Sequence, residues 1–132
     1  MSHLKIRVYY EDTDSGGVVY YANYLKFIER GRSEFLREMG FEQDQLIKHQ
    51  SVVFAVKSLQ AEYLLPARFN DLLIVDTQVE KSRRASLIFS QKIRDHKQNK
   101  VLFVAQVTVA CLDVQNFKPH AIPSNILEKI NG

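Results

Sequence analysis

The hydrophobic and polar positions change their period along the chain, and these changes divide it into strands and helices. Apolar and polar residues alternate over residues 4–10, which is typical of a half-buried strand. From Asn23 to about Met39, apolar residues recur at helical spacing and cover about half of the helical wheel. Asn23 is of a type that caps helices, and Gly40 of a type that ends them. The strand-like pattern then returns in four segments, Val52–Leu64, Leu72–Lys81, Ala85–Arg94 and Val101–Val114.

The connections between these last segments predict an antiparallel sheet. The turns at residues 66–71 and 95–99 are short and polar, whereas a parallel pair needs a crossover of about a dozen residues. The wide apolar arc of the long helix requires cover from a sheet that curls around it, and Gly31 inside this arc lets a strand approach closely. Shorter helices are expected near residues 42–49 and 124–130. The order predicts an α+β fold in which one sheet wraps around one helix.

Length and composition narrow the class of protein. The chain has 132 residues, 45% hydrophobic and 25% charged, so one domain over residues 1–132 is expected rather than a disordered chain. A single cysteine excludes a disulfide framework and a zinc site with several cysteines. No apolar run reaches the roughly 18 residues of a membrane span, and the N-terminus lacks the apolar core of a signal peptide. A cytoplasmic enzyme or binding module without stable membrane insertion is therefore expected.

The net charge of +3 is spread along the chain and identifies no partner by itself. Its densest cluster, Lys81, Arg83 and Arg84, falls at a predicted hairpin. This cluster is either an ordinary solvated turn or a contact for a phosphate-bearing ligand. No nucleic-acid-binding module is recognisable, so nucleic acid is not an expected partner. The four histidines have no mutual spacing that suggests a metal site.

The segment from Asp12 to Gly17 joins the first strand to the long helix and carries the outstanding polar motif, DTDSGG. A calcium loop of the EF-hand type does not fit, because Gly16 and Asn23 occupy two of its ligand positions. An aspartate-based phosphotransferase would need the edge of a parallel sheet, and a nucleotide-binding loop would need a glycine pattern that is absent. Two interpretations are left: the aspartates only stabilise the turn, or one of them acts beside the helix end.

A carboxylate at the start of a helix is suited to acyl transfer. The first turn of a helix has unpaired N–H groups and a partial positive charge, which polarise a carbonyl or stabilise an oxyanion. A nearby carboxylate activates water as a general base or attacks directly as a nucleophile. An aspartate of the motif and the helix N-terminus together have the groups needed to cleave an activated ester without a metal.

Residues 10–24, YEDTDSGGVVYYANY, and the following FIERGR at residues 27–32 resemble the 4-hydroxybenzoyl-CoA-type thioesterases. Among these, the chain is most similar to the YbgC-type, Tol–Pal-associated acyl-CoA thioesterases. Glu62-Tyr63 and the stretches 66–71 and 94–110 are also similar, so the resemblance extends over essentially the whole chain. It implies the hotdog fold, a five-stranded antiparallel sheet wrapped around one long helix, in agreement with the element order.

The resemblance also implies roles for residues of the motif. Asp14 corresponds to the catalytic carboxylate, and the backbone N–H of Tyr21 is expected to bind the thioester oxygen. Many relatives have histidine at the position of Tyr21, so this chain lacks that imidazole. No metal or cofactor is implied. Substrate contacts are expected from Gly16, Gly17, Val18 and Tyr20, and contacts with the CoA phosphates from Lys81, Arg83 and Arg84.

The expected function is hydrolysis of an acyl-CoA to a carboxylic acid and CoA, with acyl-carrier protein as a further candidate partner. A dehydratase of the same fold is disfavoured, because the loop lacks the histidine and the proline-rich segment of that class. The alternative from another class is a non-catalytic acyl-carrier or envelope-assembly binding protein on a hotdog scaffold. A single curved sheet leaves unpaired edge strands, so a homodimer or homotetramer with active sites at the junction is expected.

Overall fold

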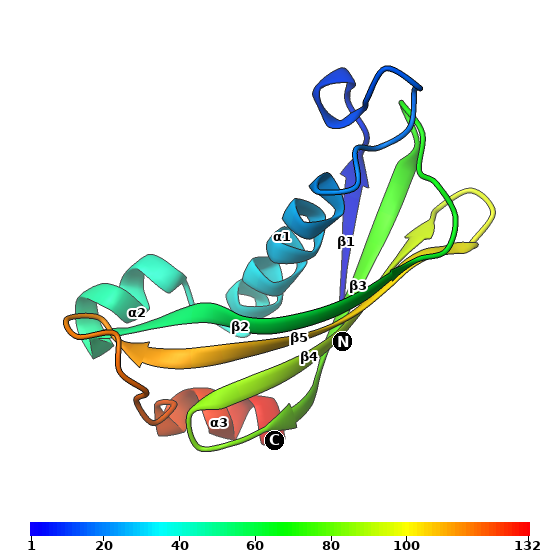
Figure 1. Cartoon of the computed structure of the whole chain (residues 1–132). Helices are drawn as coiled ribbons and strands as arrows, with labels where there is room; N and C mark the ends of the chain where they lie inside the picture. The colour runs from blue at the N-terminus through cyan, green and yellow to red at the C-terminus, as the bar shows by residue number, and fades with distance from the viewer.

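Five strands and three α-helices make up the chain, which a computed structural model describes over residues 1–132 (Figure 1). The strands are β1 (Ser2–Arg7), β2 (Val52–Tyr63), β3 (Leu72–Ser82), β4 (Ser86–Asp95) and β5 (Val101–Asp113). The helices are α1 (Asn23–Glu38), α2 (Gln43–Gln50) and α3 (Ser124–Asn131), and a single 3₁₀ turn covers Tyr10–Asp12. This order agrees with the hydrophobic pattern. None of the helices is both long and apolar enough to cross a membrane.

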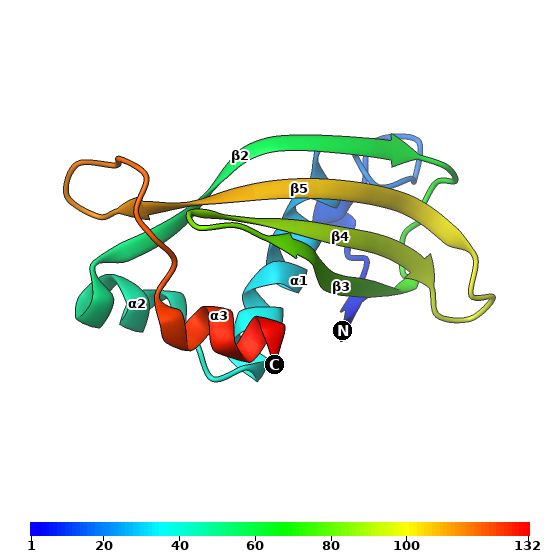
Figure 2. The ribbon, with the colours of Figure 1, turned by 90° about the horizontal axis from the view of Figure 1, so that it is seen from below.

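The five strands form one antiparallel sheet in the order β1-β3-β4-β5-β2. β3, β4 and β5 follow one another as hairpins, and β2 pairs with β5 from Val52 opposite Asp113 to Tyr63 opposite Phe103. β1 and β2 are therefore the two edges of the sheet. Figure 2 shows the long strands curving, with α1 behind them.

α1 packs on the inner face of this curved sheet. The close approach predicted at Gly31 is confirmed, because a Cβ atom there would lie only 2.7 Å from Val75 Cγ1 and 2.8 Å from Thr77 Oγ1. The arrangement is the α+β hotdog fold that the sequence predicts. The buried residues of α1 are Asn23, Tyr24, Phe27, Ile28, Gly31, Phe35 and Leu36.

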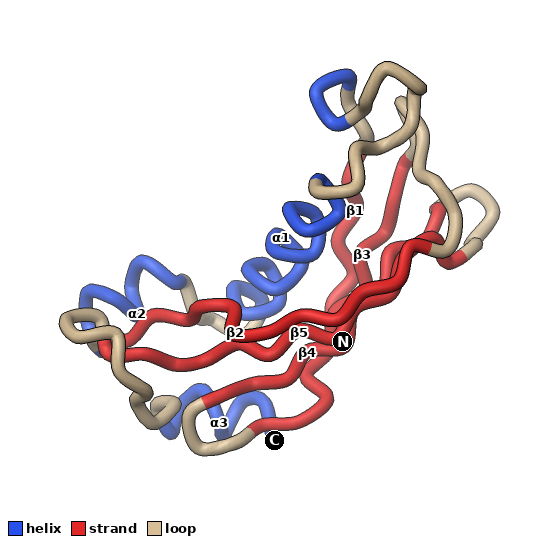
Figure 3. Tube along the Cα trace, in the orientation of Figure 1, coloured by secondary structure: helices blue, strands red, loops and turns tan.

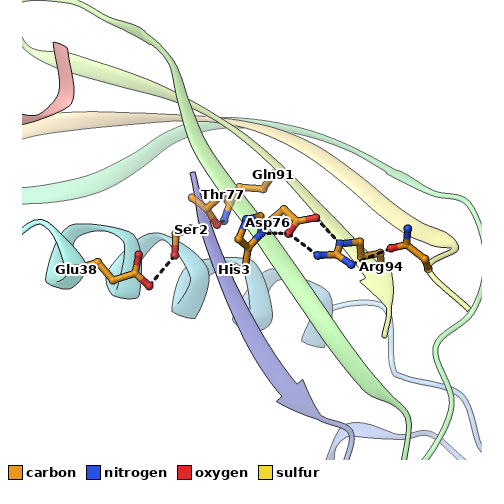
Figure 4. Close-up of polar contacts among 8 residues, drawn as sticks. Ser2, His3, Glu38, Asp76, Thr77, Gln91 and Arg94 are labelled. Carbon is orange, nitrogen blue, oxygen red and sulfur yellow. Dashed lines mark hydrogen bonds and ion pairs between the residues drawn. The ribbon is translucent and has the colours of Figure 1, made fainter. Parts of the chain in front are cut away.

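Polar side chains tie β1 and α1 to the central strands (Figure 4). The Asp76 carboxylate is buried, accepts a hydrogen bond from Arg94 Nε at 2.8 Å and pairs with His3 Nδ1 at 2.5 Å. This cluster lies on the outer face of the sheet, since Asp76 alternates with residues that face α1. On the inner face, Gln91 Nε2 donates to the Ile28 carbonyl at 2.8 Å. The edge strand and the helix are thus each held by side chains from the middle of the sheet.

Two local predictions are wrong, one at the end of β1 and one at the start of α1. β1 ends at Arg7 rather than at residue 10, because the chain turns where the Asp12 carboxylate accepts the Tyr9 N–H at 2.9 Å. Asn23 does not cap α1. It is buried in the first turn of the helix, and its side chain donates to the Asp12 carbonyl at 2.9 Å. Both differences arise from hydrogen bonds within the loop that joins β1 to α1.

The loop between β1 and α1 lies beside the connection from β2 to β3, at one end of the molecule (Figure 3). Val18 forms an isolated bridge with Arg68, and the Val19 N–H donates to the Ala67 carbonyl at 2.8 Å. The Phe69 N–H donates to the Gly17 carbonyl at 3.3 Å. Two segments about fifty residues apart in the sequence are therefore joined by backbone hydrogen bonds, which hold the DTDSGG motif against the connection from β2 to β3.

Candidate active site

The DTDSGG motif folds into a small hairpin in front of α1. Thr13 and Val19 form an antiparallel bridge, and the Asp14 N–H donates to the Val18 carbonyl at 2.9 Å. Gly17 adopts φ +79°, a left-handed conformation that favours glycine, and its N–H donates to the Asp14 carbonyl at 3.1 Å. The hairpin gives Asp14 a defined backbone position at the surface of the molecule.

The Asp14 carboxylate has one fixed oxygen and one free oxygen. Its Oδ1 accepts the Gly16 N–H at 2.8 Å, whereas Oδ2 has no partner in the chain and the residue is exposed. A Cβ atom at Gly16 would lie 3.2 Å from Asp14 Oδ1, so glycine at this position leaves room around the carboxylate. A carboxylate oriented through one oxygen can use the other to accept a proton from water or to attack a carbonyl carbon.

The start of α1 leaves backbone N–H groups without an acceptor, among them those of Tyr21 and Ala22. The Tyr20 N–H donates to the Asp12 carbonyl at 2.9 Å, and the Asn23 N–H donates to the Tyr20 carbonyl at 2.8 Å. The N–H groups of Tyr21 and Ala22, which lie between them, have no partner in the chain. Such unpaired donors at a helix start can bind the oxygen of a carbonyl or an oxyanion.

Tyrosine rings form a wall beside these free amides. The ring centroids of Tyr20 and Tyr21 are 4.8 Å apart, and Tyr63 meets the Tyr21 ring edge-on at 6.5 Å. The Tyr63 hydroxyl donates to the Tyr21 backbone carbonyl at 2.9 Å. Burial, together with the neighbouring Tyr21, raises the pKa of Tyr63, so its hydroxyl stays protonated. From the sequence, Tyr63 is one of several tyrosines that either line an acyl tunnel or simply pack, and no pattern links its hydroxyl to the start of α1.

An apolar groove of about 610 Å³ runs between α1 and the exposed edge strand β2. It begins at Leu25, about one turn beyond the free amides. Leu25 belongs to the apolar arc predicted for the helix, and its side chain is nevertheless 37% exposed. Arg32 also lines the groove, and its guanidinium donates a hydrogen bond to Gln91 Oε1 at 3.0 Å. Burial lowers the pKa of this guanidinium. The hydrophobic pattern could not find the groove, because its walls are ordinary apolar positions of a helix and a strand. The lining residues are Leu25, Lys26, Ile28, Glu29, Arg30, Arg32, Val56, Leu59 and Val107.

A second and larger hollow, of about 700 Å³, lies elsewhere on the molecule. Gln60, Gln78, Lys92 and Gln106 line it on the outer face of the sheet. No residue of the Asp14 hairpin contributes to it, so it is separate from the candidate site.

The predicted substrate-contact residues fall into two groups. Gly16, Gly17 and Val18 belong to the Asp14 hairpin, and Tyr20 stands next to the free amides. Lys81, Arg83 and Arg84 are exposed at the β3–β4 turn, near the opposite end of the sheet (Figure 1). One chain therefore does not bring the basic cluster to Asp14.

Comparison with known proteins gives consistent results over nearly the whole chain. The family model described as the thioesterase-like superfamily matches residues 8–130. The acyl-CoA thioesterase YbgC of Haemophilus influenzae is 44% identical over 121 residues, which cover 92% of this chain and 88% of that protein. The acyl-CoA thioesterase YbgC of Helicobacter pylori is 36% identical over 98% of this chain and 99% of its own length. The crystal structure of a probable thioesterase from Bartonella henselae superposes with a TM-score of 0.87 at 34% identity, covering 92% of this chain and 98% of that one.

Proposed function

The chain belongs to the thioesterase-like superfamily, and we propose that it hydrolyses the thioester bond of an acyl-CoA. Relatives 44% identical over 92% of the chain bear the name acyl-CoA thioesterase or acyl-CoA thioester hydrolase. The structural observation that supports the proposal lies within residues 14–22. The free oxygen of Asp14 and the unpaired amides of Tyr21 and Ala22 belong to one short segment. The products are a carboxylic acid and CoA, the cellular location is the cytoplasm, and thioesters of acyl-carrier protein are a second candidate substrate.

The backbone N–H of Tyr21 binds the thioester oxygen in this proposal. As a nucleophile adds to the carbonyl carbon, negative charge develops on that oxygen, and the partial positive charge of the α1 N-terminus stabilises it. The donor is part of a folded backbone, so it needs no rearrangement when the charge forms. The side chain at position 21 does not take part in this step, so the step is compatible with tyrosine in place of the histidine that the family resemblance implies there.

Asp14 acts on the other side of the carbonyl, by one of two routes. As a general base, it removes a proton from water, whose oxygen adds to the carbonyl carbon before the CoA thiolate leaves. As a nucleophile, it displaces the thiolate and forms an anhydride, which water then hydrolyses. Only the second route can place solvent oxygen in the Asp14 carboxylate, which happens when water attacks the Asp14 carbonyl of the anhydride rather than its acyl carbonyl. Label in the Asp14 peptide after a single turnover in ¹⁸O-water, measured by mass spectrometry, therefore identifies the nucleophilic route. Neither route needs a metal, so we expect full activity in the presence of a chelator.

A second copy of the chain completes the site in this proposal. β2 is a 12-residue edge strand with unpaired backbone groups, and Val56 and Leu59 on it are 54% and 38% exposed. In a symmetric side-by-side pair, the two β2 strands run antiparallel. The partner's Asp14 hairpin would then lie toward the end of this sheet that carries the basic cluster. Strands are spaced about 4.8 Å apart, so the β3–β4 turn is roughly 15 Å from the shared edge, within reach of an extended CoA.

Replacement of Asp14 tests the proposed function. We expect Asp14→Ala to lower kcat on a panel of acyl-CoAs by about a thousandfold or more, because both routes use its carboxylate. Turnover is followed by release of the CoA thiol, and circular dichroism verifies the fold. Asp44→Ala, which removes an exposed carboxylate of α2, is the matched control and should retain full activity.

Undiminished turnover by Asp14→Ala would contradict the role of Asp14. A wild-type protein that binds acyl-carrier protein tightly but hydrolyses no acyl thioester of any chain length would favour the non-catalytic alternative.

A further inference from the structure

The Tyr21 carbonyl lies two residues before the first residue of α1 and accepts no backbone N–H. The Leu25 N–H donates to the carbonyl of the following residue, Ala22, at 3.2 Å. The Tyr21 carbonyl accepts the hydroxyl of Tyr63 at 2.9 Å, from a residue 42 positions away in the sequence. The start of α1 is thus anchored by the last residue of β2.

This anchor determines the direction of a free amide. The peptide unit is planar and trans, so the Tyr21 carbonyl and the Ala22 N–H point in opposite directions. Because the Tyr63 hydroxyl binds the carbonyl on one side of this peptide, the Ala22 N–H points to the opposite side. No group of the chain accepts a hydrogen bond from it there. The Tyr21 N–H, one peptide earlier, is also unpaired.

Tyr63 is itself rigidly held, although it is 47% exposed. Its ring meets that of Tyr24 edge-on at 5.2 Å and that of the buried Phe103 at 5.0 Å. Phe103 is also its register partner on β5. A side chain fixed by two aromatic contacts loses little further freedom when its hydroxyl forms a hydrogen bond. A tyrosine hydroxyl is protonated at neutral pH, so it acts as the donor of this hydrogen bond.

We propose that Tyr63 is a positioning residue for the thioester oxygen. Its hydroxyl orients the Tyr21–Ala22 peptide and with it the Ala22 N–H, which binds the oxyanion together with the neighbouring Tyr21 N–H. This inference rests on the proposed thioesterase function and adds a second amide and its support to it. Tyr63 does not touch the substrate carbonyl and acts only through the backbone.

Tyr63→Phe tests the inference, because it removes one oxygen atom and keeps the ring. We expect kcat for acyl-CoA hydrolysis to fall about tenfold with KM changed less than about twofold, a smaller effect than the roughly 10²–10³ lost with a whole oxyanion donor. A trifluoromethyl ketone analogue of acyl-CoA, which forms a tetrahedral oxyanion adduct, should bind weaker by a similar factor. A thioether analogue, which lacks the carbonyl, should bind Tyr63→Phe as tightly as it binds the wild-type protein.

The matched control is Tyr24→Phe, in the same aromatic cluster. It removes a hydroxyl that accepts the Ala67 N–H at 2.9 Å, so it should lower Tm and leave kcat unchanged. An independent measurement is the ¹⁵N chemical shift of the Ala22 amide, which should move in Tyr63→Phe and stay in Tyr24→Phe.

Several results would overturn the inference. One is a wild-type kcat in Tyr63→Phe, and another is an equal loss of affinity for both analogues, which indicates a general structural effect. If Tyr63→Phe is fully active while Asp14→Ala is inactive, the inference is wrong and the proposed function stands. If the wild-type protein hydrolyses no acyl thioester, the proposed function itself is wrong.

Discussion

Two aspartates separated by one residue have different surroundings in the loop before α1. The Asp12 carboxylate accepts the Tyr9 N–H at 2.9 Å, and its carbonyl accepts both the Tyr20 N–H and the Asn23 side chain. Its polar groups are thus engaged in holding the loop. Asp14 has a free oxygen and projects from the hairpin. The two residues are of the same type, and their hydrogen bonds distinguish them: those of Asp12 hold the loop, whereas Asp14 keeps a free oxygen for the proposed chemistry.

A third aspartate, Asp76, makes stability depend on pH. Burial alone would raise the pKa of Asp76, but the hydrogen bonds and charges of Arg94 and His3 hold it below its usual value. A carboxyl group with a lowered pKa in the folded state stabilises the fold above its unfolded pKa of about 3.9, and this stabilisation is lost as pH falls through the folded value. We expect Asp76→Asn to lower the free energy of unfolding by about 2 kcal/mol at pH 7, with the difference from wild type shrinking below about pH 4.

Urea unfolding followed by circular dichroism between pH 3 and pH 8 measures this difference. Asp44→Asn, at an exposed position of α2, is the control and should leave the pH dependence unchanged. A constant difference between Asp76→Asn and wild type at all pH values would show that the charge of Asp76 contributes nothing.

The contact between α1 and the sheet depends on one residue without a side chain. Gly31 costs the helix about 1 kcal/mol relative to alanine. A Cβ atom there would nevertheless meet Val75 Cγ1, Thr77 Oγ1 and Gln91 Nε2 at 2.7, 2.8 and 3.0 Å. These are distances at which the neighbouring side chains must move. At the scale of the element, close approach of helix and sheet outweighs helix propensity.

Substitution of Gly31 measures this balance. Overpacking a filled core costs about 1–3 kcal/mol, so Gly31→Ala should be net destabilising by about 1 kcal/mol and Gly31→Val by more. The free energy of unfolding in urea is the measurement, and Lys26→Ala on the exposed side of α1 should change it by less than about 0.5 kcal/mol. A Gly31→Ala variant more stable than wild type would mean that the sheet yields easily at this point.

Within one molecule, the two parts of the proposed substrate site lie far apart. The Asp14 hairpin and the basic turn with Lys81, Arg83 and Arg84 lie toward opposite ends of the sheet (Figure 1). The open edge of β2 is the element through which a partner copy would bring them together. The proposed contact between the CoA phosphates and the basic turn therefore depends on dimerisation, so the contact and the dimer are tested together.

We expect the protein to sediment as a dimer or tetramer at micromolar concentration. The triple variant Lys81→Ala, Arg83→Ala, Arg84→Ala should raise KM for an acyl-CoA about tenfold, because it removes the charges proposed to pair with the phosphates. KM for the corresponding acyl-pantetheine, which has no nucleotide phosphates, should not change. The same increase for both substrates, or a monomer in solution, would contradict this arrangement.

Most of the fold follows from local sequence patterns. The alternation along the strands, the apolar arc of α1 and the short polar turns are properties of neighbouring residues, and they predicted the element order and the antiparallel sheet. The DTDSGG motif likewise predicted an aspartate beside the helix start, because a loop and the helix that follows it are adjacent in any fold, whereas the choice of Asp14 rests on the family resemblance. The prediction failed at Asn23, where the side chain bonds to Asp12 instead of capping the helix.

Contacts between residues that are far apart in the chain could be found only from the tertiary structure. Tyr63 reaches Tyr21 only because β2 pairs with β5 and ends beside the first turn of α1. The groove along Leu25 exists only because β2 is an edge strand. The periodicity of a sequence determines which face of an element is apolar. Strand order and the ends at which elements meet determine which side chains share a site, and these are set by packing over the whole molecule.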